Sequence, residues 1–120
     1  MSNARQRIGT WGESAAAGYL QGRGYVVLGR NIRTPWGEID LLVRKDDLLV
    51  FVEVRTRTSS SFGFPEESVT RRKQAHMLAS AEYALQELVP SYDNWQFDVI
   101  AIEGKPGTHP KITHFENVLA

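Results

Sequence analysis

The fold of this 120-residue chain is decided by residues 37–57, which read GEIDLLVRKDDLLVFVEVRTR. Two runs of aliphatic residues flank a polar turn centred on Asp46 and Asp47. A two-residue turn at this place pairs Lys45 with Leu48 and predicts a β-hairpin. A slip of one residue would move every side chain of a strand to the other face of the sheet, so the apolar pattern favours this register.

In this register Asp40 lies opposite Glu53, and strict alternation places Ile39 and Leu41 together on the other face of the sheet. Directly opposed side chains have β-carbons about 5 Å apart, so two carboxylates there repel each other. Glu53 also interrupts the most apolar strand of the chain, where an unpaired charge is costly. A bound Mg²⁺ or Mn²⁺ would offset that cost, since both cations prefer oxygen ligands. The alternative is ion pairing with arginines of the same face: Arg44, Arg55 and Arg57.

The rest of the chain alternates between helical and strand patterns. Thr10 and Glu13 have the spacing of a capping box, which predicts a first helix near residues 11–22. Apolar residues at helical spacing predict a second helix over about 68–89, ended by Pro90. Further strands are expected at 25–28, 95–102 and 111–115. The predicted fold class is α/β: a single domain, residues 1–120, with a mixed central β-sheet flanked by helices.

Composition excludes several classes of protein. The chain has no cysteine, which excludes a disulfide scaffold, a thiolate zinc site and a cysteine nucleophile. It has no apolar run long enough for a membrane helix and no apolar stretch of signal-peptide type at its amino terminus. We therefore expect a soluble, cytoplasmic protein without membrane contacts.

The charges balance, with 14 Lys and Arg against 14 Asp and Glu, but they are unevenly distributed. The first sixty residues hold nine of the fourteen cations. Arg71, Arg72 and Lys73 lie at the expected start of the second helix, where the helix dipole favours anions rather than cations. Such a cluster suits a phosphate, unless Glu66 and Glu67 neutralise it. A nucleic-acid backbone could contact this cluster and a strip of further cations: Arg30, Arg33 and Arg57.

Several motifs together resemble those of the YraN-like family of uncharacterised bacterial proteins. They are Gly9-Thr10-Trp11-Gly12-Glu13, Gly37-Glu38-Ile39-Asp40-Leu41, Phe51-Val52-Glu53-Val54-Arg55-Thr56-Arg57, Lys73 and Phe97-Asp98-Val99-Ile100. The resemblance covers about residues 9–103. It implies a restriction-endonuclease-like core of the PD-(D/E)XK superfamily, similar to Holliday-junction resolvases.

The resemblance also implies a set of site residues. Asp40 and Glu53 match the metal-binding carboxylates, the backbone carbonyl of Val54 would complete the protein's ligands, and Glu13 matches a further acid on the first helix. Arg55 stands where the superfamily motif has lysine. Arginine can stabilise charge on a phosphate but accepts a proton poorly, because it stays charged. Lys73 is therefore the expected substitute.

These implications lead to two expected functions. The first is a metal-dependent endonuclease that hydrolyses phosphodiester bonds with low sequence specificity, since cations that contact phosphates do not read bases. DNA is favoured over RNA as its substrate, branched DNA is a candidate, and the resemblance to resolvases suggests a homodimer. The alternative is a non-catalytic nucleic-acid-binding module, which the arginine at position 55 favours. A role in protein interaction, with the acidic half recruiting a partner, is a third reading. We expect Asp98 to be structural, and the histidines to be surface or packing residues: His76, His109 and His114.

Overall fold

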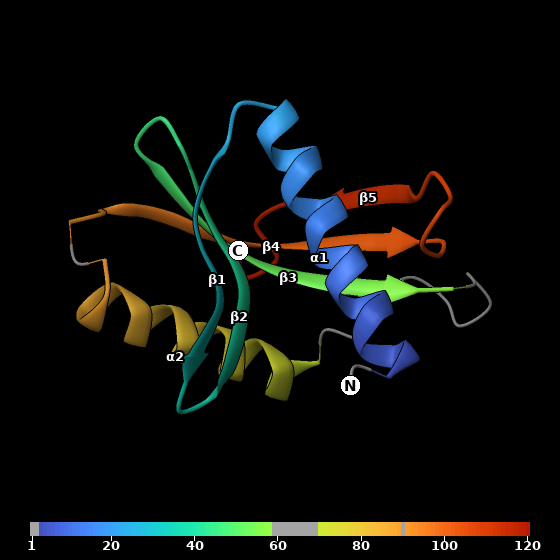
Figure 1. Ribbon diagram of the computed structural model, residues 1–120. Coiled ribbons are helices and arrows are strands. Elements are labelled where there is room, and N and C mark those ends of the chain that lie inside the picture. Colours follow the sequence, from blue (N-terminus) through green and yellow to red (C-terminus); the bar gives the residue numbers. More distant parts are fainter. Residues whose placement is uncertain (1–2, 59–69, 90) are drawn as a thin grey trace.

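The computed structural model describes residues 3–58, 70–89 and 91–120, which form two helices and five strands (Figure 1). In chain order they are α1 (Ala4–Gly22), β1 (Val26–Thr34), β2 (Gly37–Lys45), β3 (Leu48–Arg57), α2 (Arg71–Glu87), β4 (Asn94–Glu103) and β5 (Lys111–Phe115). The expected fold class, a mixed sheet flanked by helices, is confirmed.

The five strands form one sheet in the order β1-β2-β3-β4-β5. Strands β3 and β4 are parallel, with α2 as the crossover between them, and the other neighbours are antiparallel. The β2–β3 hairpin has the expected register, because Lys45 pairs with Leu48 and Leu41 pairs with Val52. Asp46 takes a positive φ of 54° in the turn, a conformation that aspartate tolerates better than most residues.

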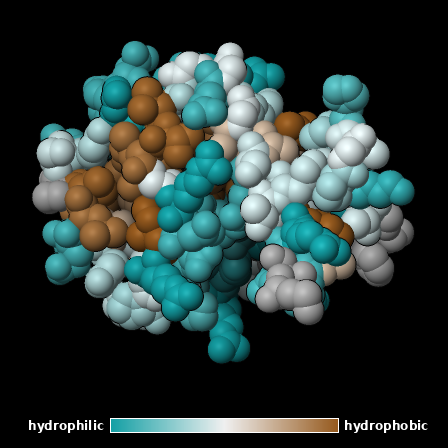
Figure 2. Space-filling view, in the orientation of Figure 1, coloured by the Kyte–Doolittle hydropathy of each residue, from teal (hydrophilic) through white to brown (hydrophobic). Residues whose placement is uncertain are grey.

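Each helix covers one face of the sheet, so the sheet has an apolar core on both sides (Figure 1). Helix α1 packs Ala16, Ala17 and Leu20 against one face, and α2 packs Met77, Ala81 and Ala84 against the other. Within the described residues, no helix is long and apolar enough to cross a membrane. Figure 2 shows a hydrophobic patch on the left of one side of the molecule and hydrophilic residues over its centre.

The first helix begins earlier than its sequence pattern indicates. It starts at Ala4 and is capped by Asn3, whose side chain accepts a hydrogen bond from the Gln6 backbone nitrogen at 2.8 Å. In return, the Gln6 side-chain oxygen accepts a hydrogen bond from the Asn3 backbone nitrogen. Thr10 lies inside the helix, so the expected capping box at Thr10 and Glu13 is wrong. The same cap chemistry occurs about two turns earlier along the chain, and the earlier cap leaves Glu13 without a capping role.

The second helix agrees with its pattern over the described residues. Thr70 caps it by accepting a hydrogen bond from the Lys73 backbone nitrogen at 3.2 Å. Glu66, Glu67 and Pro90 lie outside the described residues. Strand β1 is longer than expected, since it continues to Thr34 and forms one edge of the sheet.

Candidate metal centre and flanking cations

The sheet is irregular where Asn31 of β1 lies opposite Asp40 of β2. The ladder includes the neighbouring pairs Arg30–Leu41 and Ile32–Ile39 but omits Asn31 and Asp40. Asn31 has a φ of 52°, a left-handed conformation that asparagine adopts more readily than most residues. The β2–β3 ladder ends at the Leu41–Val52 pair, so Asp40 is paired in neither of the two ladders that β2 forms.

This irregularity overturns the expected alternation of faces. Ile39 packs in the core under α2, whereas Leu41 packs in the core under α1. Asp40 is correspondingly turned toward α1, where its Oδ2 accepts a hydrogen bond from the Val54 backbone nitrogen at 2.7 Å. The expected direct pairing of Asp40 with Glu53 is absent from the ladder. The Val54 backbone N–H therefore donates its hydrogen bond to a side-chain carboxylate rather than to a backbone carbonyl of β2.

Three carboxylates meet at this place. Oxygens of Glu13 on α1 and of Glu38 and Asp40 on β2 all lie within 4.8 Å of one another. Asn31 holds two of them: with its amide nitrogen turned toward the acceptors, it donates to Glu13 Oε1 at 3.2 Å and to Glu38 Oε1 at 3.0 Å. Glu13 and Asp40 line a pocket beside the first turns of α1, together with Arg5, Ile8, Gly9, Val54 and Thr56.

The electrostatics of this cluster favour a positive charge within it. Burial, together with the nearby charges of Glu13, Glu53 and Glu38, raises the pKa of Asp40 from 3.8 to about 6, although the Val54 hydrogen bond lowers it. Burial and Glu38 also raise the pKa of Glu13. Close carboxylates with raised pKa values are the donor set that a hard divalent cation stabilises. The residues present therefore fit Mg²⁺ or Mn²⁺.

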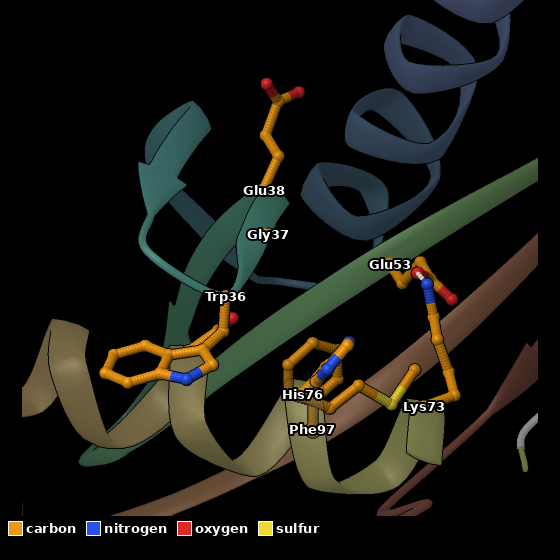
Figure 3. Close-up of a pocket in the computed structure, with 9 residues that line it drawn as sticks. Trp36, Gly37, Glu38, Glu53, Lys73, His76 and Phe97 are labelled. Carbon is orange, nitrogen blue, oxygen red and sulfur yellow. Dashed lines mark ion pairs between the residues drawn. The ribbon is translucent and has the colours of Figure 1, made fainter.

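Glu53 points to a second pocket on the α2 side of the sheet. Its carboxylate bridges two cations, with Lys73 Nζ at 2.6 Å and the Arg55 guanidinium at 2.8 Å. Figure 3 shows Lys73 and Glu53 directed toward each other, with Trp36 at the far end of the pocket. The Glu38 carboxylate points away from this pocket (Figure 3).

The predicted site residues therefore separate into two groups on the two faces of β3. Glu13, Asp40 and Val54 line the α1-side pocket, whereas Glu53 and Lys73 line the α2-side pocket. Glu53 lies close enough to influence the pKa of Asp40 but is not part of the cluster of three carboxylates. Glu53 makes the ion pair with Arg55 that the alternative interpretation expects, and Lys73 is a second partner.

The remaining predicted cations are not among the described lining residues of either pocket. Arg71 and Arg72 are exposed in the first turn of α2, one and two residues before Lys73. Arg30 and Arg33 are exposed on the edge strand β1, and Arg57 is half-buried at the end of β3. Trp36 is 49% exposed and makes an edge contact with the Tyr83 ring, their centroids 6.5 Å apart.

Sequence reasoning missed Glu38 and Asn31 as members of the site. Glu38 carried one usable signal, since its spacing of two residues from Asp40 places both on one face of a regular strand. Asn31 carried none, because nothing in a nine-residue strand pattern indicates a left-handed residue at its centre. Its role depends on the approach of α1 to the β1–β2 ladder.

Comparison with known proteins identifies relatives along nearly the whole chain. Residues 12–102 match the model of the uncharacterised protein family UPF0102. A UPF0102 protein of Syntrophotalea carbinolica is 43% identical over 96% of this chain and 93% of its own. A UPF0102 protein of Syntrophomonas wolfei is 44% identical over 93% of this chain and 96% of its own.

Among solved structures, the chain is similar to Pyrococcus furiosus SfsA in complex with Ca²⁺, with a TM-score of 0.40 and 12% identity. The match covers 95% of this chain and 64% of that chain, a little under two thirds of its length. The resemblance to the YraN-like family is confirmed by the sequence relatives. From the match over residues 12–102 and from identities above 40% along almost the full length, this chain belongs to the UPF0102 family.

Proposed function

We propose that the protein is a metal-dependent endonuclease that hydrolyses phosphodiester bonds with low sequence specificity. The observation that carries the proposal is the cluster of Glu13, Glu38 and Asp40, in which burial first and the close negative charges second raise the pKa values of Glu13 and Asp40. A bound cation would offset the repulsion between these carboxylates. The ion pair of Glu53 and Lys73, on the other face of β3, adds a positive group beside that strand.

Each residue of the site has a distinct part in this proposal. Glu13, Glu38 and Asp40 would hold Mg²⁺ or Mn²⁺, with the Val54 carbonyl as the further ligand that the family resemblance implies. The bound cation supplies Lewis-acid stabilisation of phosphate charge and a more acidic water. The Val54 backbone N–H holds the Asp40 carboxylate in place through its 2.7 Å hydrogen bond. Lys73 and Arg55, which Glu53 orients, would stabilise the negative charge that develops on the phosphate.

The proposed substrate is DNA, branched DNA included. The exposed cations Arg30, Arg33, Arg71 and Arg72 would contact its backbone, with Arg57 at the end of β3. A homodimer is also proposed, and sedimentation of the protein with and without branched DNA would measure it.

One observation favours a second function, a module that binds nucleic acid without cleaving it, and the same assay tests it. Arg55 and Lys73 are both bound to Glu53, and arginine at position 55 cannot act as a proton acceptor at neutral pH. A module that binds nucleic acid without cleaving it would keep the cations and need no turnover.

Cleavage assays separate the two functions. Branched, single-stranded and duplex DNA are incubated with the purified protein in Mg²⁺, Mn²⁺ or EDTA. The endonuclease proposal expects metal-dependent nicking that Asp40→Asn and Glu53→Gln each lower by at least about a hundredfold, the scale on which removal of a charge-stabilising group acts. The exposed acid Asp93 provides a control, and Asp93→Asn should cleave normally.

The other results of the assay are equally informative. Cleavage that survives unchanged in both variants would place the chemistry elsewhere. Salt-sensitive DNA binding without cleavage in any metal would favour the module. RNA substrates run in parallel determine whether DNA is the preferred partner.

A further inference from the structure

Another polar pocket, distinct from the two described above, lies on the α1 side of the sheet, away from the carboxylate cluster. It is formed where the last turn of α1 meets the start of β1, the end of β2 and the end of β5. Its lining residues are Tyr19, Arg23, Tyr25, Lys45, His114 and Glu116. Nothing in the proposed endonuclease site uses these residues.

Behind this pocket lies Asp98 of β4, which is fully buried. Its Oδ1 accepts hydrogen bonds from Gln96 Nε2 and from the Asn117 backbone nitrogen, both at 2.9 Å. Its Oδ2 is 2.7 Å from His114 Nε2. A carboxylate only accepts hydrogen bonds, so the His114 Nε2 must carry its proton toward Asp98. Asp98 is thus structural, as expected, and it fixes the orientation of the His114 ring.

The fixed ring turns its other nitrogen toward the tyrosines. His114 Nδ1 is 3.4 Å from the Tyr19 hydroxyl, and the two rings meet edge to face with centroids 5.7 Å apart. Burial raises the pKa of Tyr25, and the charges of Asp98 and Glu116 raise it further. Like an ordinary tyrosine, Tyr25 carries its hydroxyl proton at neutral pH, so the hydroxyl can donate a hydrogen bond to a ligand.

Two cations are held over the tyrosine rings at the mouth of the pocket. The Arg23 guanidinium carbon lies 4.5 Å from the centroid of Tyr19, and Lys45 Nζ lies 5.2 Å from the centroid of Tyr25. Contact with a ring face restrains a side chain that would otherwise be free at an exposed position. The pocket thus presents two restrained positive charges beside the Tyr25 hydroxyl.

These contacts make the pocket a poor site for a cation, although Asp98, His114 and Glu116 lie close enough together to bind one. Both oxygens of Asp98 already accept hydrogen bonds from N–H donors, and His114 Nε2 is one of those donors. A metal ion would have to break those bonds and approach Arg23 and Lys45. An anion would instead meet Arg23 and Lys45, with Glu116 as the one acid among the described lining residues and the Asp98 carboxylate behind them already hydrogen-bonded.

We propose that this pocket binds a phosphate monoester, held by Arg23 and Lys45 and by the hydroxyl of Tyr25. Doubly charged phosphate suits a pair of cations better than a carboxylate ligand does, and a guanidinium binds phosphate oxygens in a bidentate manner. The chemistry is shared by free phosphate and by the terminal phosphate of a nucleic-acid strand.

The test is a titration of inorganic phosphate, followed by the imidazole signals of His114 in NMR spectra of the full chain. His76→Gln and His109→Gln, both at exposed positions, leave His114 as the one remaining imidazole. Saturable shifts of its signals are expected. Arg23→Gln and Lys45→Gln should each weaken binding about tenfold, the scale of one charged hydrogen bond.

Glu116 provides the sharpest control, because the two kinds of ligand predict opposite results. Glu116→Gln should tighten phosphate binding several-fold, since it removes a negative charge from the described lining of the pocket. A metal site would instead lose affinity for Zn²⁺ in the same variant. Lys105→Gln, at an exposed loop position outside the pocket lining, should leave phosphate binding unchanged.

Any of three results would overturn the proposal. The His114 signals show no saturable shift with phosphate, the variants Arg23→Gln and Lys45→Gln bind phosphate as tightly as the parent protein does, or the protein binds Zn²⁺ in a manner that depends on Glu116. A second titration compares an oligonucleotide carrying a 5′-phosphate with the same strand lacking it. Tighter binding of the phosphorylated strand than of the strand without the phosphate, with the difference lost in Arg23→Gln, supports a strand end as the ligand, and equal binding of the two strands supports free phosphate.

Discussion

Asp40 shows how strongly a single residue responds to its surroundings. Its carboxylate is turned into a pocket among other acids, and burial is the main cause that raises its pKa to about 6. A folded-state pKa above the unfolded value means that the folded protein binds the proton more tightly. The resulting stability is fully present below pH 4 and is lost as the pH rises through 6.

Asp40→Asn should therefore change the free energy of unfolding in a pH-dependent manner. In EDTA we expect the variant to be as stable as the parent at pH 4 and more stable at pH 7.5, by at most about 3 kcal/mol for a shift of about two pKa units. The asparagine oxygen can still accept the Val54 hydrogen bond. Urea unfolding at both pH values measures the difference, and Asp93→Asn is the control. An equal effect of Asp40→Asn at pH 4 and pH 7.5 would contradict the raised pKa.

A divalent cation should stabilise the parent protein at neutral pH and so offset the loss of stability that the buried Asp40 carboxylate causes. Mg²⁺ or Mn²⁺ at a hundred times its dissociation constant stabilises a folded protein by about 2.7 kcal/mol. The cluster geometry predicts that Glu38→Gln loses most of this stabilisation, whereas Glu53→Gln, whose carboxylate is bound to Lys73 and Arg55, loses less. Thermal unfolding with and without the metal ranks the variants. The reverse ranking would show that Asp40 and Glu53 form the metal site, as the motif alone suggests.

At the scale of the elements, the position of α1 depends on a close approach to β3. Gly12 is buried where the helix crosses the strand, and a methyl group there would collide with the Thr56 side chain, including its β-carbon at 3.0 Å. Gly18 on the same helix has nothing within 4 Å of the corresponding position. The contrast makes the two glycines a matched pair.

Gly12→Ala should destabilise the protein by about 1–3 kcal/mol, the usual cost of overpacking. Gly18→Ala should be neutral or stabilising by up to about 1 kcal/mol, because alanine favours helix and meets no obstacle. Chemical unfolding of the two variants tests both values. Equal stability of the two would mean that α1 can move away from Thr56 without cost.

The strands and helices themselves could largely be predicted from local patterns. Alternation and the Asp46-Asp47 turn predict the hairpin and its register, and β4 and β5 agree with their predicted ranges to within one residue. The start of α1 could not be predicted as well, because Asn3 and Thr10 both carry usable cap chemistry. Local sequence cannot decide between two adequate caps when the helix can extend through both.

At the scale of the whole molecule, a chain of zero net charge carries both exposed cations and an acidic cluster. Arg71 and Arg72 at the start of α2 are exposed, whereas Lys73 is bound to Glu53. A chain with balanced charge can still bind a polyanion through such a local surface.

DNA binding should therefore weaken as salt rises, with a slope set by the number of phosphates that the cations neutralise. Arg71→Gln and Arg72→Gln together should weaken binding of duplex DNA and lower the slope of log K against log salt by about 2. Fluorescence anisotropy at several salt concentrations measures the slope. Lys105→Gln, at an exposed loop position, should leave it unchanged. A slope that stays the same in the double variant would exclude the start of α2 from the interface.

The amino-acid sequence by itself determined the fold class, the hairpin register, the family and the residue types of the site, because these follow from periodicity, turn chemistry and local motifs. Tertiary structure alone decided which carboxylates meet. A left-handed Asn31 opposite Asp40 turns the Asp40 side chain toward α1, so it joins Glu13 and Glu38 while Glu53 remains on the other face with Lys73. One irregular position reverses the face of a side chain, and no period-two pattern records it.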